Sequence, residues 1–286
     1  MCGVTGVIAP KSSLAFRQDM LHWMTLFSEK RGRDATGVAY VGGNGKMTVS
    51  KNGVRAEDYF NSELWADVKG HLPAISVGHC RAATKVAGDP KDNVNNHPFY
   101  SEHSGIAMIH NGHMDDDKWR KTVGRPKGIM HDFTGLTDSE VMLRLVETLV
   151  LREDNSMDMD KAIDNGCYNI AGSYTLAFLR ESEPNKIWLV RHDNPLVLCY
   201  LPKHNAILFA SEEDIITSAI SQCKTHLGFF RESFYPKHIL QDAEEDSLTS
   251  IQILEQEPFF EITTKKVECP KKTFYAGYNA SWGTGD

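Results

Sequence analysis

The sequence predicts an α+β fold built from mainly antiparallel sheets that helices cover. Three observations lead to this prediction. The chain has 286 residues, of which 41% are hydrophobic, and this is enough to bury a full core. Apolar residues recur at the helical period in two groups of segments, whereas many short β-prone runs fill the rest of the chain. Short turns rather than βαβ crossovers join these runs, so neighbouring strands are expected to pair antiparallel.

The first elements are a strand, a helix and a hairpin. Apolar residues over 4–8 predict a buried strand, which Pro10 ends. A helix follows with Ser12 or Ser13 as its N-cap, because apolar residues then recur at helical spacing, namely Phe16, Met20, Met24 and Phe27. The charged loop over 31–37 after this helix is a candidate wall of a site. Two strands then form a hairpin across a glycine-rich turn, over 38–41 and 47–51.

Two strands in the middle of the chain lead into polar residues that are suited to chemistry. The strand over 74–79 delivers Arg81 to the end of a sheet, and the strand over 105–110 ends in Asn111-Gly112. Asn-Gly is typical of a turn. A turn at a strand end also offers a side-chain amide beside a backbone N–H, which is the donor pair that an oxyanion hole requires.

A further helix is predicted to begin after Thr137. Thr137 and Glu140 have the spacing of a capping box, with the Glu140 carboxylate reaching back to the N-cap. Asp138 is then a favourable acidic residue at a helix N-terminus, or a carboxylate that binds a substrate ammonium, and both can hold together. Later helices are expected over 157–167 and 211–221, and later strands over 173–179, 186–191, 196–201 and 207–210, with weaker ones near 239, 251–254 and 259–263.

These elements predict one domain over residues 2–262 and a tail over 263–286. The tail is rich in Lys, Gly and Tyr and has no periodicity, which makes it a candidate partner contact. The net charge of -7 and the pI near 5.9 argue against a nucleic-acid or anionic-membrane surface. No apolar run approaches the ~20 residues that cross a bilayer, so a cytoplasmic protein is expected.

The cysteines and histidines indicate neither a metal site nor a disulfide framework. The six cysteines form no C-x-x-C pair, and the twelve histidines show no ligand spacing. No glycine-rich phosphate loop is present either, so no cofactor is predicted. A reducing compartment would keep the thiol of Cys2 usable.

Cys2 is the candidate nucleophile because removal of Met1 would expose a thiol and an α-amine on the same residue. A cysteine attacks as its thiolate, and a free α-amine titrates near ~8. Such a residue can carry its own general base at neutral pH.

The motifs along the chain together resemble those of the class II glutamine amidotransferases. They occur in the order and rough spacing of that family over about residues 2–215: Cys2-Gly3, Arg31-Gly32 with Asp34 and Gly37, Gly78-His79-x-Arg81-x-Ala83-Thr84, Asn96-His97-Pro98-Phe99, His110-Asn111-Gly112 and Thr137-Asp138-Ser139-Glu140. The resemblance implies the N-terminal-nucleophile (Ntn) hydrolase fold, a four-layer αββα sandwich of two mainly antiparallel sheets. The stretch over 123–134 looks like extra length and is a candidate lid or partner loop.

The resemblance also implies an activity and a role for each matched residue. The activity is hydrolysis of the side-chain amide of L-glutamine through a Cys2 thioester, which gives glutamate and ammonia for a separate acceptor synthetase or ligase. The implied roles are nucleophile for Cys2, oxyanion donors for Asn111 and Gly112, binding of the substrate α-carboxylate for Arg81 and of its α-ammonium for Asp138, pocket wall for Thr84 and His97, and a brace of the N-terminal strand for Arg31.

Two other functions fit parts of the sequence. An Ntn-type amidase that acts on another amide would use the same nucleophile, although Arg81 with Asp138 favours a free amino acid. A non-catalytic module could keep the fold, but it would not need the full set of chemical groups.

Overall fold

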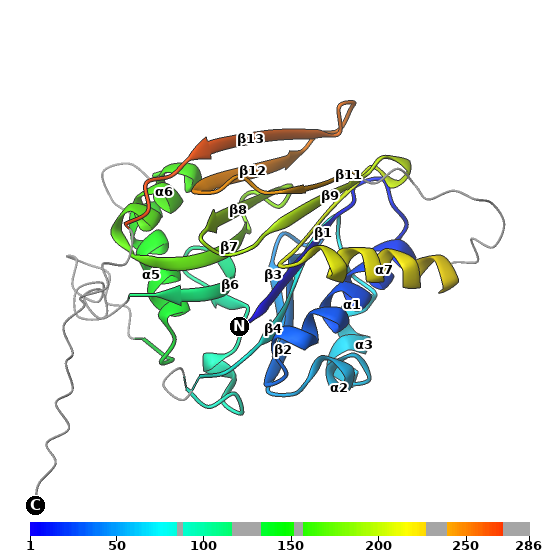
Figure 1. Cartoon of the computed structure of the whole chain (residues 1–286), viewed down its shortest axis with the longest axis horizontal. Helices are drawn as coiled ribbons and strands as arrows, with labels where there is room; N and C mark the ends of the chain where they lie inside the picture. Colours follow the sequence, from blue (N-terminus) through cyan, green and yellow to red (C-terminus); the bar gives the residue numbers. More distant parts are fainter. Residues whose placement is uncertain (85–87, 116–132, 152–156, 227–238, 271–286) are drawn as a thin grey trace, which may run out of the picture.

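The computed structural model describes residues 1–84, 88–115, 133–151, 157–226 and 239–270 (Figure 1). The strands in this part of the chain form two sheets, and all the strand pairings within them are antiparallel. None of the described helices is both long enough and apolar enough to span a membrane.

The first sheet, called sheet A here, has β1 near its centre. Its strand order is β11-β9-β10-β1-β4-β2-β3. The strands are β1 (Gly3–Ile8), β2 (Ala35–Val41), β3 (Met47–Asn52), β4 (Ile75–Arg81), β9 (Val197–Leu201), β10 (Ala206–Ala210) and β11 (Ile239–Asp242).

The second sheet, sheet B, has the order β13-β12-β8-β7-β6-β5. Its strands are β5 (Phe99–Ser101), β6 (Ile106–Met114), β7 (Gly172–Arg180), β8 (Lys186–His192), β12 (Ser247–Ile253) and β13 (Phe260–Lys266). The chain passes from sheet A to sheet B between β4 and β5, returns to sheet A between β8 and β9, and passes to sheet B again between β11 and β12.

Helices cover the outer faces of the two sheets (Figure 1). On the side of sheet A lie α1 (Leu14–Ser28), α2 (Ala56–Phe60), α3 (Glu63–Lys69) and α7 (Glu213–His226). On the side of sheet B lie α5 (Asp138–Val150) and α6 (Met159–Asn169). Short 3-10 helices lie at Glu29–Arg31, Asn93–Asn95 and Pro202–His204.

Three apolar cores account for these layers. One lies between sheet A and its helices, and a second lies between sheet B and its helices. The third lies between the two sheets, where side chains such as Val4, Ile109 and Phe209 are completely buried. Burial of apolar area on both faces of each sheet supplies the main driving force for this arrangement. The predicted α+β fold of antiparallel sheets between helix layers is therefore confirmed.

Several local predictions were wrong. Asn111-Gly112 does not form a turn, because β6 continues to Met114 and pairs with β7 over its whole length. Thr137 is the N-cap of α5, but its side chain makes no capping hydrogen bond. The Glu140 carboxylate instead accepts from the backbone N–H groups of Thr134 and Gly135, in the turn before the helix.

Other elements were not predicted. Helices α2 and α3 and strand β5 are short, so their sequences carry little periodic signal. Strand β13 runs past residue 262, and the predicted boundary between domain and tail therefore falls inside a strand. The stretch over 116–132 and the tail over 271–286 lie outside the described residues.

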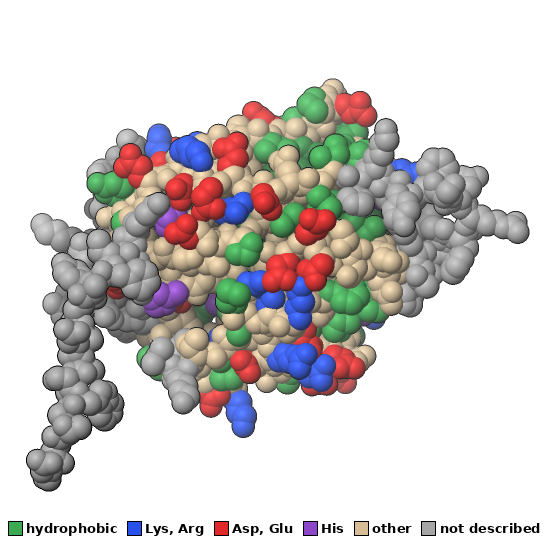
Figure 2. All heavy atoms as spheres, viewed as in Figure 1, with side chains coloured by type: hydrophobic (Ala, Val, Ile, Leu, Met, Phe, Trp, Pro, Cys, Tyr) green, Lys and Arg blue, Asp and Glu red, His purple; other side chains and the backbone are tan. Residues whose placement is uncertain are grey.

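Charged side chains of both signs are interspersed on the face drawn in Figure 2. Asp and Glu outnumber Lys and Arg in the whole chain, 38 against 31. This face does not present the continuous stripe of basic side chains that nucleic-acid binding would need.

Candidate active site

Cys2 directly precedes β1, between the ends of β10 and β4. Gly3 pairs with Cys80, so the residues just after β4 lie beside Cys2. The backbone N–H of Ala82 donates to Cys2 Sγ over 3.4 Å, and Sγ lies 3.8 Å from the Ala82 carbonyl oxygen. The thiol is thus held by the backbone of the segment that also carries Arg81.

Arg31 fixes the backbone of residue 2. Its Nε donates to the Cys2 carbonyl oxygen over 2.7 Å, and its guanidinium forms an ion pair with Glu212. On the other side of the strand start, Ser211 Oγ accepts from the Val4 N–H over 3.0 Å. These contacts come from the 3-10 helix after α1 and from the residues that follow β10, and together they restrain the position of Cys2.

The loop over 31–37 packs under the segment that follows β4. A Cβ atom on Gly32 would lie 2.3 Å from the Arg81 carbonyl carbon, so only glycine allows this close approach. The Asp34 N–H donates to the Arg81 carbonyl oxygen over 3.0 Å, and the Asp34 carboxylate accepts from the Ala83 N–H over 2.7 Å. Sequence analysis named this loop as a site wall, and these contacts connect it to residues 81–83.

Arg81 is the last residue of β4 and is 2% exposed. Its Nη1 donates to Asn96 Oδ1 over 2.8 Å, and its Nη2 donates to the Gly88 carbonyl oxygen over 3.1 Å. Asn96 is itself fixed, because its Nδ2 donates to the Pro90 carbonyl oxygen and to Asn93 Oδ1. Burial lowers the pKa of Arg81, and the carboxylates of nearby acidic residues oppose that shift.

Asn111 and Gly112 lie in β6 rather than in a turn. The Asn111 side chain is completely buried, and neither its Nδ2 nor its Oδ1 has a hydrogen-bond partner among the described residues. Gly112 has φ 139°, and a Cβ atom there would lie 2.1 Å from the Ser173 carbonyl oxygen. Gly112 must therefore be glycine. Asn111 keeps a buried amide whose donors bond to none of the described residues, and such groups usually have a functional reason.

Asp138 lies at the start of α5, against the end of β6. Its Oδ2 accepts from the Met114 N–H over 2.8 Å. Its carboxylate oxygens lie 3.7 Å from His110 Nδ1 and 3.7 Å from His113 Nδ1, and its side chain is 20% exposed. The carboxylate is thus anchored by one backbone bond while part of it faces solvent.

The charges of Arg81 and Asp138 both affect the pKa of the Cys2 thiol. Burial raises the pKa of the Cys2 thiol; the Ala82 N–H, the N-terminal ammonium and Arg81 oppose this, while Asp138 adds to it. The thiol form is therefore favoured at neutral pH, and Cys2 needs a base to become a nucleophile. With Met1 attached, residue 2 has no free α-amine.

Three buried histidines lie behind these residues. His79 Nε2 lies 2.8 Å from the His110 carbonyl oxygen, which connects β4 of sheet A to β6 of sheet B. Ser139 Oγ lies 2.9 Å from His97 Nε2 and 2.8 Å from His110 Nδ1. Burial lowers the pKa of all three imidazoles, that of His79 to about 3, so they are neutral at pH 7.

A cavity of about 590 Å³ lies elsewhere, between β9, β11, β12 and β13. Ile207 lines it and pairs with Ile8 at the far end of β1 from Cys2. Because a strand rises about 3.3 Å per residue, this end of β1 is roughly 20 Å from Cys2. The cavity is therefore not where the thiol would act.

Comparisons with known proteins find relatives along most of the chain, although no family model matches it. The glutamine–fructose-6-phosphate aminotransferase (isomerizing) of Bacteroides thetaiotaomicron is 30% identical over 198 residues, 69% of this chain and 30% of that protein. The protein of the same name from Clostridium acetobutylicum is 32% identical over 198 residues, with the same coverage. The chain thus spans about 30% of the length of these relatives.

Solved structures share the fold. The glutamine phosphoribosylpyrophosphate amidotransferase of B. subtilis, complexed with ADP and GMP, matches 92% of this chain and 49% of its own, with TM-score 0.62 and 18% identity. A glutamine aminotransferase class-II domain protein from Silicibacter pomeroyi matches 93% of this chain and 100% of its own, with TM-score 0.55 and 14% identity. The chain belongs to the class II glutamine amidotransferase family.

The structure brings most of the residues expected of a class II glutamine amidotransferase to one end of the sandwich. Cys2 and Arg81 are joined through the backbone at Ala82, and Asp138 contacts the end of the strand that carries Asn111. His97 lies behind this group, 4% exposed, with its ring 4.1 Å from that of His79. Thr84 is exposed, at the edge of the described segment.

Sequence analysis gave no role to several residues that contact the candidate site residues. Asn96 orients Arg81, and Ser139 joins two histidines. Lys51, which is half-buried, donates to the carbonyl oxygens of Asn96 and Pro98, and desolvation lowers its pKa to about 8. Asn96 and Ser139 occur within the family motifs, so a signal was present, whereas Lys51 lies in an ordinary hairpin strand.

Proposed function

We propose that this chain hydrolyses the side-chain amide of L-glutamine and releases ammonia for an acceptor in a separate synthetase or ligase. The observation that carries the proposal is the buried Asn111 amide, which has no partner among the described residues and lies beside Gly112. Leaving such a group unpaired costs about 1–3 kcal/mol. A substrate oxyanion would repay this cost by accepting its hydrogen bond.

Cys2 is the proposed nucleophile. After removal of Met1, its own α-amine would take the thiol proton, directly or through a water, and the sulfur would attack the amide carbonyl carbon of glutamine. A base is required because burial raises the pKa of the thiol. The C–N bond then breaks, ammonia leaves with a proton returned by the amine, and a γ-glutamyl thioester on Cys2 is hydrolysed by water.

Asn111 Nδ2 and the Gly112 N–H are the proposed oxyanion donors. A preorganised donor of this kind commonly contributes ~3 kcal/mol to the transition state. The φ of 139° at Gly112 and the close approach of Ser173 explain why this backbone needs glycine. Both donors belong to a paired strand, which keeps them fixed.

Arg81 and Asp138 are proposed to bind the amino-acid end of the substrate. The planar guanidinium of Arg81 suits a carboxylate, and Asn96 fixes its orientation. The Asp138 carboxylate suits an ammonium group and is anchored at the Met114 N–H. Thr84 and His97 are proposed for the wall of the pocket, and Arg31 as the brace of residue 2 through its bond to the Cys2 carbonyl oxygen.

The acceptor is proposed to be a synthetase or ligase outside residues 1–286. The described helices and strands are all used by the four layers of the sandwich. The name of the relatives gives fructose 6-phosphate as their acceptor, but this chain spans only about 30% of them. The isolated chain is expected to be a slow glutaminase that an engaged acceptor enzyme accelerates.

The test compares L-glutamine with N-acetyl-L-glutamine, using protein whose mass shows that Met1 has been removed. Glutamate release from L-glutamine, absent in Cys2→Ala, is the expected result. Equal turnover of the N-acetyl compound would favour an amidase for another substrate, because Asp138 would then have no ammonium to bind. No turnover of either compound, with or without co-purifying proteins, would favour a non-catalytic module.

A further inference from the structure

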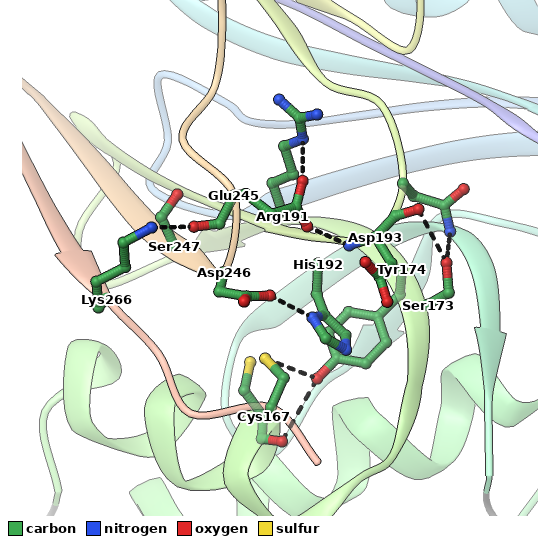
Figure 3. Close-up of polar contacts among 12 residues, drawn as sticks. Cys167, Ser173, Tyr174, Arg191, His192, Asp193, Glu245, Asp246, Ser247 and Lys266 are labelled. Carbon is green, nitrogen blue, oxygen red and sulfur yellow. Dashed lines mark hydrogen bonds and ion pairs between the residues drawn. The ribbon is translucent and has the colours of Figure 1, made fainter. Parts of the chain in front are cut away.

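Three side chains of metal-ligand type meet on the sheet B side of the molecule. His192 is the last residue of β8, Asp246 directly precedes β12, and Cys269 lies beyond the end of β13. One ligand atom from each, a ring nitrogen, a carboxylate oxygen and Sγ, lies within 4.8 Å of the other two. Figure 3 shows His192 and Asp246 pointing toward each other next to Tyr174.

The group is held by specific contacts. His192 is completely buried, and its Nδ1 lies 2.6 Å from Asp246 Oδ1. Its Nε2 is buried and has no hydrogen-bond partner among the described residues. Tyr174 donates its hydroxyl toward Cys269 Sγ over 3.5 Å, and its ring lies 5.2 Å from the His192 ring. Asp246 has φ 50°, a left-handed conformation that is uncommon for a residue other than glycine.

We propose that His192, Asp246 and Cys269 bind a transition-metal ion of the zinc class. Zinc is bound by thiolate at about 2.3 Å and by imidazole or carboxylate at about 2.0–2.2 Å, usually in a tetrahedron. Ligand atoms on such a tetrahedron are roughly 3.3–3.8 Å apart. Atoms that already lie within 4.8 Å of one another reach this geometry through side-chain shifts of about 1 Å.

Cys167 of α6 is the proposed fourth ligand. Cys167 is buried, and its backbone carbonyl oxygen accepts from the Tyr174 hydroxyl over 3.4 Å, while the same hydroxyl lies 3.5 Å from Cys269 Sγ. Two thiolates, an imidazole and a carboxylate suit zinc, or cobalt as its probe, whereas magnesium and calcium require sites made of oxygen. Both thiols would release their protons on binding the ion, so affinity should rise with pH.

The ion would lie behind the proposed oxyanion donor. Tyr174 pairs with Gly112 across β6 and β7. Two residues after His192, Asn194 donates to Ser173 Oγ over 3.0 Å, and its Nδ2 would lie 2.6 Å from a Cβ atom on Gly112. A metal that fixes His192 and the segment after β13 would therefore stiffen the wall against which Gly112 packs. This consequence rests on the proposed function, whereas binding of the ion does not.

The test is titration of the full chain, purified with chelator and reductant, with Co²⁺ alone. One ion per chain and the visible absorption of tetrahedral Co²⁺ with thiolate ligands are expected, together with a rise in Tm of roughly 5 °C or more at saturation. Cys269→Ser and His192→Asn are expected to weaken binding by at least ~10–100-fold. Cys223→Ser changes a buried thiol in another core, and Cys2→Ala removes the nucleophile, so both should bind Co²⁺ as the original chain does.

Two results would overturn the metal site. One is Co²⁺ binding that survives Cys269→Ser and His192→Asn but disappears in Cys2→Ala, since the ion would then lie at the nucleophile. The other is less than a tenth of an equivalent of bound Co²⁺ in a chain that circular dichroism shows to be folded. If Cys269→Ser does not fold, Asp246→Asn, at a side chain that is 39% exposed, takes its place, and the same loss of Co²⁺ binding is required. Glutaminase activity without any bound metal would leave the proposed function intact while removing this site.

Discussion

Two buried asparagines offer a direct test of the site. Asn96 and Asn111 are both completely buried. Asn96 accepts from Arg81 and donates to Pro90 and Asn93, whereas the Asn111 amide has no partner among the described residues. Replacing each by alanine removes the same atoms, so the difference between the two variants reports how well each amide was paired.

The expected magnitudes follow from this difference. Asn111→Ala leaves a small cavity but removes an unpaired amide whose burial costs about 1–3 kcal/mol, so stability should change little or increase. Asn96→Ala removes one hydrogen bond from the Arg81 guanidinium, which keeps its bond to Gly88, and one from the Pro90 carbonyl oxygen, at about 1–3 kcal/mol each. The two variants should therefore differ by at least about 2 kcal/mol in stability, or roughly 4–8 °C in Tm.

The loss of activity is not expected to parallel the loss of stability. Asn111→Ala is expected to lower kcat for glutamine by about 10²–10³, the usual cost of one oxyanion donor. Both quantities can be measured on the same preparations, by thermal unfolding and by glutamate release. A loss of stability in Asn111→Ala equal to that of Asn96→Ala, or a kcat within tenfold of the original, would refute the assignment of Asn111 as a donor kept for the transition state.

Three further outcomes are expected. A diazo-ketone analogue of glutamine should label Cys2 and leave Cys80 unmodified, because Cys80 is completely buried and burial raises its pKa to about 12. Peptide mass spectrometry after digestion identifies the labelled cysteine. A label on Cys80 would contradict this prediction. Arg81→Lys should raise KM for glutamine at least tenfold, because one point charge replaces a two-pronged donor, and unchanged steady-state kinetics would exclude Arg81 from the pocket. Stability should fall as the pH falls below about 6.5, because the unfolded chain then binds protons that the buried His79, with its pKa lowered to about 3, does not. The contribution is up to about 1.4 kcal/mol per pH unit and is lost progressively down to about pH 3. Urea unfolding at several pH values should show a smaller slope in His79→Gln, while the exposed His71→Gln keeps the original slope.

The elements that the sequence predicted are those in which local pattern and tertiary packing agree. The helix with Ser13 as its N-cap shows the helical period of its apolar residues, and the buried strand β1 is a short run rich in apolar residues that Pro10 follows. The end of β6 is the opposite case. Asn-Gly favours a turn locally, but pairing with β7 and the unusual φ of Gly112 extend the strand through it. Pairing with β7 therefore determines the conformation of this segment, and the local sequence pattern does not predict it.

The candidate site likewise contains residues that the sequence predicts and contacts that it does not. Cys2, Arg81 and Asp138 were predicted as site residues because each occurs in a short motif. The capping box failed because Glu140 bonds the preceding turn, a contact that depends on how residues 133–136 fold back. The group of His192 with its two ligand-type neighbours could not be found from spacing, because its members come from three strand ends that only the sheet order brings together.

The buried histidines also bear on which group acts as the base. A general base at neutral pH needs a pKa near 7, yet burial lowers that of His79 to about 3 and that of His97 well below its ordinary value. The α-amine that Met1 removal would expose on Cys2 titrates near ~8 and lies on the nucleophile itself. The rate at low glutamine concentration should therefore rise with pH through about 8, as the amine loses its proton, and the same inflection should persist in His79→Gln. An inflection near 6.5 that this substitution removes would mean that a histidine takes the thiol proton instead.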